Sequence, residues 1–179
     1  MRRGRKMGRR VIRNRVALHL ESRCRVAAKL KRAGLKVKPQ TPWGQPWHKF
    51  DLLINSAVRV SLKSAAAHWS QHAVVSRGRH YNYRYLTWHF NFHRHGRMPE
   101  RYADFIICVA RGSRGNKRSA DDYFIIPWEA ITGKTFAFHR ASAPYSGHYA
   151  AYRNNWEPLF KAVTKHQAPV AVTASTAVA

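Results

Sequence analysis

The sequence predicts an α/β protein with a mixed central sheet flanked by helices. Three observations predict this class: a helical pattern spans residues 14–33, short apolar runs follow it, and a second helical segment spans residues 152–162. The run from Ala103 to Ala110 is almost continuously apolar, which is typical of a central strand buried on both faces. A chain of 179 residues is long enough for one domain with a hydrophobic core and short for two.

The first helix is expected between Asn14 and Ala33. Asn14 is a suitable N-cap and Gly34 a suitable C-cap. Arg and Lys occupy most of the helix surface, which leaves one amphipathic face. That face is expected to carry Val16, Leu20, Ala27 and Leu30, with Cys24 at its margin.

Three short strands are expected next. Leu35 to Val37 begins the first, and residues 39–47 form a loop because they contain three prolines and a glycine. The second and third strands, residues 49–54 and 58–63, are joined by a tight turn at Asn55-Ser56. A tight turn makes the two strands neighbours in one sheet.

This hairpin carries the most informative residues of the chain. Asp51 lies in the second strand, and Ser61-Leu62-Lys63 ends the third. We expect one carboxylate and one ammonium at the same edge of the sheet. A metal-binding Asp beside a Lys that acts on water or phosphate is a minimal pair for phosphodiester cleavage. The alternative for Asp51 is a salt bridge with Lys63 or Arg59, and for Lys63 an exposed edge lysine.

The middle of the chain is ambiguous. Residues 64–69 suit either a short helix or an irregular crossing. Residues 77–85 interleave basic and aromatic side chains, which suits phosphate contacts with base stacking and equally a strand with an aromatic face in the core. Residues 86–92 alternate as a strand, with one face formed by Leu86, Trp88, Phe90 and Phe92.

The C-terminal half contains further strands. Residues 111–120 form a Gly- and Ser-rich hairpin loop, and residues 123–126 form a strand that stops at Pro127. Residues 136–139 form one more short strand. Pro158 forces the last helix to start late or to kink.

Charge restricts the partners of the chain. Lys and Arg number 33 and Asp and Glu number 8, so the formal net charge is +25. Nucleic acid is the commonest polyanion for such a surface. A ribosome-like or membrane-surface protein is the alternative. Domain organisation is expected as a basic flexible arm over residues 1–15, a folded domain over 16–164 and a disordered tail over 165–179. The arm suits contact with a polyanion; a solvated tail or a targeting presequence are the alternatives.

Several classes are disfavoured. Two cysteines without CxxC spacing support neither a disulfide framework nor a zinc ribbon, and the histidine spacings lack a second pair for zinc. No apolar run reaches the length of a membrane span, and no apolar segment follows the N-terminal charges as in a secretory signal. We therefore expect an intracellular protein, cytoplasmic or nucleoid-associated.

These strings resemble the PD-(D/E)XK nuclease superfamily, which has the restriction-endonuclease-like fold. Phe50-Asp51-Leu52-Leu53 resembles the strand that carries its metal-binding Asp, and Val60-Ser61-Leu62-Lys63-Ser64-Ala65 resembles its lysine strand. Asp104-Phe105-Ile106-Ile107 and Tyr123-Phe124-Ile125-Ile126-Pro127 resemble two later strands of small members. The resemblance covers residues 14–160 and is nearest to junction resolvases and homing endonucleases.

The resemblance implies an αβββαβ core and a metal-dependent DNA endonuclease of homing or junction-cleaving type. It implies one or two Mg²⁺ or Mn²⁺ ions, held by Asp51, the Leu62 carbonyl and Glu21, with Lys63 and Ser61 completing the catalytic set. It also implies duplex or branched DNA as substrate and a homodimer, since small members often pair to cut two strands.

Two positions depart from the family pattern. Ser61 stands where the family has an acidic residue or Gln, so the ion would lose a charged partner. Glu21 is the acid available on the first helix, but anchoring the helix on Val26 and Leu30 brings Arg23 nearer that position. Both departures favour a second hypothesis, a catalytically weakened protein of the same fold that binds DNA or RNA without cleaving it. An unrelated basic RNA-binding or ribosome-associated protein is the third.

Nucleic-acid contacts are expected from two basic stretches, the N-terminal arm and the segment 77–85. The candidates are Arg9, Arg10, Arg13, Arg15, Arg77, Arg79, Tyr81, Tyr83 and Arg84.

Overall fold

The computed structural model describes residues 3–40, 50–92, 100–112, 121–140 and 146–167. For residues 3–15, 140 and 167 it describes the backbone alone. The expected loop at 39–47, the hairpin loop at 111–120 and the C-terminal tail lie largely outside the described residues. No helix in the described ranges is both long enough and apolar enough to cross a membrane.

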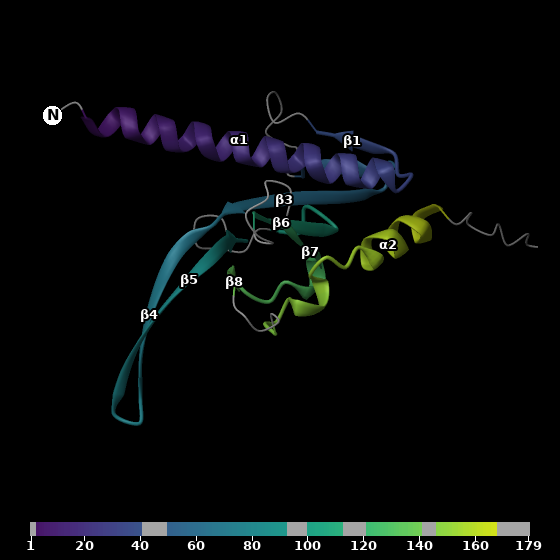
Figure 1. Cartoon of the computed structure of the whole chain (residues 1–179). Helices are drawn as coiled ribbons and strands as arrows, with labels where there is room; N and C mark the ends of the chain where they lie inside the picture. The colour runs from purple at the N-terminus through teal and green to yellow at the C-terminus, as the bar shows by residue number, and fades with distance from the viewer. Residues whose placement is uncertain (1–2, 41–49, 93–99, 113–120, 141–145, 168–179) are drawn as a thin grey trace, which may run out of the picture.

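Two α-helices, two 3-10 helices and eight strands make up the described chain (Figure 1). In chain order they are α1 (Arg3–Arg32), β1 (Val37–Pro39), β2 (Leu52–Ile54), β3 (Val58–Ala66), β4 (His68–Ser76), β5 (Arg79–Asn91), β6 (Phe105–Arg111), β7 (Asp122–Pro127), η1 (Trp128–Ala130), β8 (Thr135–Arg140), η2 (Ala150–Tyr152) and α2 (Glu157–Gln167).

The central sheet has the strand order β1-β2-β3-β6-β7. Strands β3 and β6 pair in parallel, with Ser61 opposite Ile106, while the other neighbours are antiparallel. The sheet is therefore mixed, as expected, and the apolar run at 103–110 forms the buried strand β6. The tight turn is also confirmed, because Asn55 and Ser56 both have positive φ, at 47° and 60°, as in a type I′ hairpin turn.

The two faces of this sheet are covered differently. Helices α1 and α2 pack on one face, where Leu30 and Leu159 join a cluster with β2, β3, β6 and β7. Strands β5 and β8 pack on the other face through a layer of aromatic side chains that includes Trp88, Phe90 and Phe136. The expected alternation of residues 86–92 is confirmed by burial of Trp88, Phe90 and Phe92.

The second sheet, β4-β5-β8, resolves the ambiguous middle of the chain. Residues 64–69 form neither a helix nor an irregular crossing: β3 continues to Ala66, β4 begins at His68, and β4 and β5 form a long antiparallel hairpin. This hairpin projects away from the central sheet (Figure 1). It also lies where an αβββαβ order would place a second helix between β3 and β6, and no helix appears there in the described residues.

The first helix departs from expectation at its start. It begins at Arg3, so Asn14 is an interior residue and no N-cap. Arg and Lys are good helix formers and no proline interrupts residues 3–13, so the helical backbone can extend through the basic arm. Ala27 and Leu30 are buried as expected, together with Ser22 and Val26, whereas Val16 and Cys24 are exposed.

The last helix starts at Glu157, later than residue 152, which confirms the constraint from Pro158. Proline in the first turn costs no helical hydrogen bond, because the first N–H groups have no intrahelical partner.

Candidate active site at the edge of the central sheet

Asp51 is fixed by backbone hydrogen bonds immediately before β2. Its N–H donates to the Val60 carbonyl at 2.8 Å, and its own carbonyl accepts from the Gln40 N–H at 2.9 Å. The antiparallel ladder therefore continues one residue beyond β2 on both sides. This places the Asp51 side chain directly beside β3 at the level of Ser61.

The carboxylate of Asp51 is held by three donors. The Leu62 N–H donates to Oδ2 at 2.6 Å, and the Ser61 hydroxyl lies 3.4 Å from the same oxygen. Nε2 of His19, on α1, lies 2.8 Å from Oδ1. Asp51 therefore makes no salt bridge with Lys63 or Arg59 in the described residues; Arg59 pairs with Asp104 instead.

Lys63 lies on the same face of β3 as Ser61, because alternate strand residues point to the same side. Within the described residues its ammonium forms no hydrogen bond and no ion pair. Burial raises the pKa of the neighbouring Cys108 thiol on β6, which keeps that thiol neutral beside Lys63. The half-buried Lys63 cation is therefore available to an anionic ligand.

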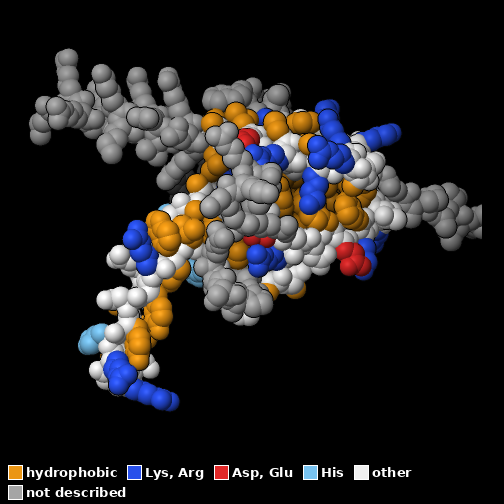
Figure 2. Space-filling model, in the orientation of Figure 1, with side chains coloured by type: hydrophobic (Ala, Val, Ile, Leu, Met, Phe, Trp, Pro, Cys, Tyr) orange, Lys and Arg blue, Asp and Glu red, His pale blue; other side chains and the backbone are white. Residues whose placement is uncertain are grey.

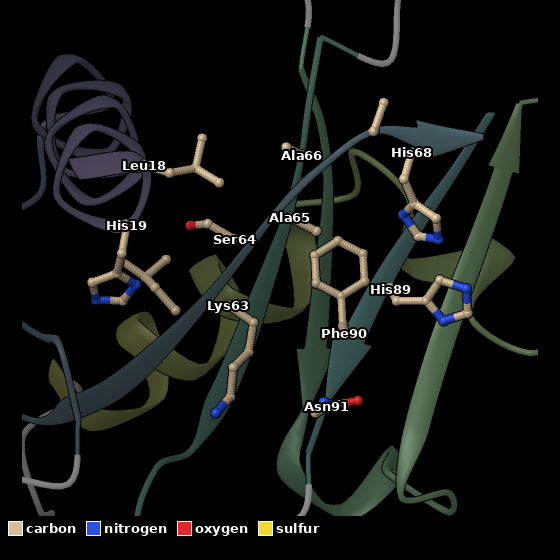
Figure 3. A pocket seen from close by; sticks show the side chains of 12 residues that line it. Leu18, His19, Lys63, Ser64, Ala65, Ala66, His68, His89, Phe90 and Asn91 are labelled. Atoms are coloured by element: carbon tan, nitrogen blue, oxygen red, sulfur yellow. The ribbon is translucent and has the colours of Figure 1, made fainter. Parts of the chain in front are cut away.

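An open cleft of about 950 Å³ borders Lys63. Residues of α1, β3, β4 and β5 line it, among them His19, Ser64, His68, His89 and Asn91. In Figure 3, His19 extends from α1 on one side, His68 and His89 lie together on the other, and Lys63 lies between them. The rings of His68 and His89 are 4.9 Å apart. The Ser64 hydroxyl is buried, and no group in the described part of the chain forms a hydrogen bond with it.

Glu21 is not brought to Asp51. Its carboxylate accepts hydrogen bonds from Arg111 at 2.8 Å and from Arg25 at 2.7 Å, and these lower the pKa of Glu21 to about 2. Both arginines also contact the buried Asp121. Glu21 therefore belongs to an ionic cluster that joins α1 to the end of β6 and the start of β7.

Two other helix residues reach the Asp51 edge. His19 contacts Asp51 itself, and Arg23 donates to the Gln40 carbonyl at 2.8 Å. The expectation that Arg23 lies nearer this edge than Glu21 agrees with that contact. Sequence reasoning missed His19, although a signal existed: His19 precedes the buried Ser22 by three residues and the buried Val26 by seven, which is the spacing of one helix face.

The residues present fit one oxygen-liganded divalent ion. A carboxylate offers about four lone-pair sites, two on each oxygen. At Asp51 two bonds use the sites of Oδ2 and one bond uses a site of Oδ1, so Oδ1 retains one free site. The Leu62 carbonyl faces the same edge as its N–H, because both groups of a strand residue point to one side. Mg²⁺ is commonly held by one carboxylate with waters and substrate phosphates. No group of three His, Cys, Asp or Glu side chains suited to a metal forms within the described residues.

The expected nucleic-acid residues fall on two elements. Arg77, Arg79, Tyr81, Tyr83 and Arg84 lie on the projecting β4–β5 hairpin, where Tyr81 is 39% and Tyr83 is 52% exposed. The alternative of an aromatic face in the core is therefore wrong for these tyrosines. The backbones of Arg9, Arg10, Arg13 and Arg15 are helical, and their side chains lie outside the described part.

The chain shares its fold with a solved endonuclease. That structure is I-Ssp6803I, a bacterial homing endonuclease, which matches with a TM-score of 0.54 and 11% sequence identity, covering 84% of this chain and 96% of that chain. At this identity the match establishes the common fold. No protein-family model matches the chain, and no curated protein does.

Proposed function

We propose that this protein is a metal-dependent DNA endonuclease of the PD-(D/E)XK type, of homing or junction-cleaving kind, with its active site at Asp51 and Lys63. The observation that carries the proposal is the contact of Asp51 with Ser61, together with Lys63, which lies on the same face of the strand and lines an open cleft. The shared fold with a homing endonuclease and a net charge of +25 support it.

The chain's own residues have separate tasks in this proposal. Asp51 and the Leu62 carbonyl hold Mg²⁺ or Mn²⁺, which would lower the pKa of a bound water and stabilise charge on the phosphate. Lys63 orients that water or neutralises the scissile phosphate. His19 is a positioning residue, because its bond to Oδ1 fixes the rotation of the Asp51 carboxylate.

The test is nicking of supercoiled plasmid in Mg²⁺ or Mn²⁺, with DNA binding measured in parallel. Asp51→Asn and Lys63→Ala should each lower nicking by about 100-fold or more while binding survives. Glu129→Gln and Lys36→Ala make the same charge changes at exposed positions away from the cleft, so they should nick like the wild type. Equal cleavage by all five proteins would contradict the proposed site.

A second candidate has its own supporting observation. Ser61 provides no charge beside Asp51, and the Asp51 oxygens already accept three bonds from the protein. These features suit a protein that binds DNA or RNA without cleaving it. In that case no divalent ion produces nicks, and affinity falls steeply with salt because each neutralised phosphate releases counterions.

A further inference from the structure

The β4–β5 hairpin is poorly explained as a stabilising element. Between Gln71 and Arg84 almost every side chain on both faces is exposed or half-exposed, including Val75 at 62%. A two-stranded hairpin without a packed face is only marginally stable in water. The exposed apolar and aromatic groups of this hairpin therefore suit burial against a partner (Figure 2).

Charge points to the kind of partner. Residues 68–91 contain Arg77, Arg79 and Arg84 together with four histidines, and no Asp or Glu. The turn itself is basic, since Arg77 and Gly78 form it with φ of 50° and 71°. In Figure 2 the end of the hairpin is blue, the colour of Lys and Arg. A polyanion complements this surface.

The two faces of the β4–β5 hairpin carry different kinds of side chain. Directly opposite residues of an antiparallel pair share a face. The tyrosine face consists of Ser70, His72, Val74, Ser76, Arg79, Tyr81, Tyr83 and Tyr85, and the amide face consists of Trp69, Gln71, Ala73, Val75, His80, Asn82, Arg84 and Leu86. On the tyrosine face the rings of Tyr81 and Tyr83 stack at 6.3 Å. On the amide face the side chains from Gln71 to Arg84 are all exposed.

We infer that the amide face reads base edges in the major groove of duplex DNA through Gln71, Asn82 and Arg84. This inference rests on the proposed function in taking DNA as the ligand. The major groove, about 12 Å wide, admits a two-stranded ribbon. Arg pairs with the O6 and N7 of guanine, and Asn and Gln pair with the N6 and N7 of adenine, each through two hydrogen bonds.

The guanidinium of Arg84 is oriented by a contact with Trp69 that leaves its hydrogen-bond donors available. Its guanidinium lies over the Trp69 ring at 4.7 Å. Stacking uses the face of the guanidinium and leaves its N–H edge free for a planar, two-pronged partner. Gln71 lies directly opposite Arg84, and among the described residues neither Gln71 nor Asn82 has a hydrogen-bond partner for its amide.

The strand geometry sets the spacing of the contacts. Asn82 and Arg84 are two residues apart on β5, a rise of about 6.6 Å. Successive bases of one DNA strand are about 3.4 Å apart along the helix axis. The bases read by these two side chains should therefore lie about two base pairs apart.

The test is selection of bound sequences from a randomised duplex library by the full chain, followed by competition binding at fixed salt. The wild type should return a preferred site. Asn82→Ala and Gln71→Ala should each lower the ratio of specific to non-specific affinity by about 5- to 100-fold. His72→Ala, on the tyrosine face, should leave the ratio unchanged.

Loss of discrimination should be confined to one base pair per variant. Unchanged specificity in both Asn82→Ala and Gln71→Ala would overturn the inference. So would preferential binding of single strands that depends on Tyr81 and Tyr83, because that result would indicate stacking instead of groove reading. Binding is measured in Ca²⁺, without cleavage, so it does not depend on nuclease activity. If only the nuclease proposal fails, the protein will still bind its preferred sequence but will not nick plasmid in Mg²⁺ or Mn²⁺.

Discussion

His19 and Asp51 are 32 residues apart in sequence, yet Nε2 of His19 lies 2.8 Å from Oδ1 of Asp51. The contact joins the first helix to the edge of the central sheet. It also determines which way the carboxylate faces, since the other oxygen is held by the Leu62 N–H.

The pair should show energetic coupling. In a double-mutant cycle of His19→Ala and Asp51→Asn, we expect the changes in the free energy of unfolding to be non-additive by about 0.5–2 kcal/mol, because the residues are in direct contact. Urea denaturation of the four proteins measures this. The same cycle with Glu129→Gln in place of Asp51→Asn should be additive, and additivity in both cycles would mean that the contact contributes nothing.

A second carboxylate beside Asp51 should make stability depend on divalent ions. Ser61 is 4% exposed and its hydroxyl lies 3.4 Å from Oδ2 of Asp51, so Ser61→Asp places a second carboxylate in a buried site beside an existing one. Without an ion we expect a loss of about 1–3 kcal/mol, since like charges and burial both oppose ionisation. Mn²⁺ should recover much of this loss in thermal unfolding. Ser61→Asn is the control and should not respond to Mn²⁺; an equal response of both variants would argue against an ion at Asp51.

Glu21 should stabilise the fold without serving the cleft. Hydrogen bonds from Arg111 and Arg25 lower the pKa of Glu21 from 4.5 to about 2. A depressed pKa in the folded state gives stability that is present above the unfolded pKa, near 4.5, and is lost as the pH falls toward 2. The difference in unfolding free energy between wild type and Glu21→Gln should therefore shrink between pH 5 and pH 2.

The same variant should retain plasmid nicking at neutral pH, because the Glu21 carboxylate binds Arg111 and Arg25 and is not among the groups that line the cleft. A stability difference that does not vary with pH would contradict the ionic role. A loss of nicking as large as that of Asp51→Asn would place Glu21 in the active site after all.

The hairpin should be dispensable for folding and needed for binding. Replacing residues 72–83 by Asn-Gly joins the opposed Gln71 and Arg84 through a two-residue turn. Neither hydrophobic cluster contains a removed residue, so we expect the thermal midpoint to change little. DNA affinity should fall, and its salt dependence should become shallower by about two phosphate contacts, because Arg77 and Arg79 are lost. Unchanged affinity and slope in a salt titration would show that the hairpin does not contact DNA.

The sequence by itself determined the features that depend on local pattern. The buried strand β6, the Asn55-Ser56 turn, the alternation of Trp88, Phe90 and Phe92 and the late start of α2 all follow from neighbouring residues, because periodicity and turn chemistry act over a few positions. The basic composition likewise needs no structure.

Tertiary structure decided what depends on distant pairing. It brought His19 to Asp51 and Arg111 to Glu21, which are 32 and 90 residues apart, and no local pattern encodes such contacts. It also formed the hairpin of β4 and β5, whose two exposed faces lack the alternation of apolar and polar residues that marks a half-buried strand. The burial of Val26 and Leu30 sets which side of α1 faces the sheet. His19 and Glu21 are two residues apart, so their side chains leave the helix about 200° apart. Of these two, only His19 therefore contacts Asp51.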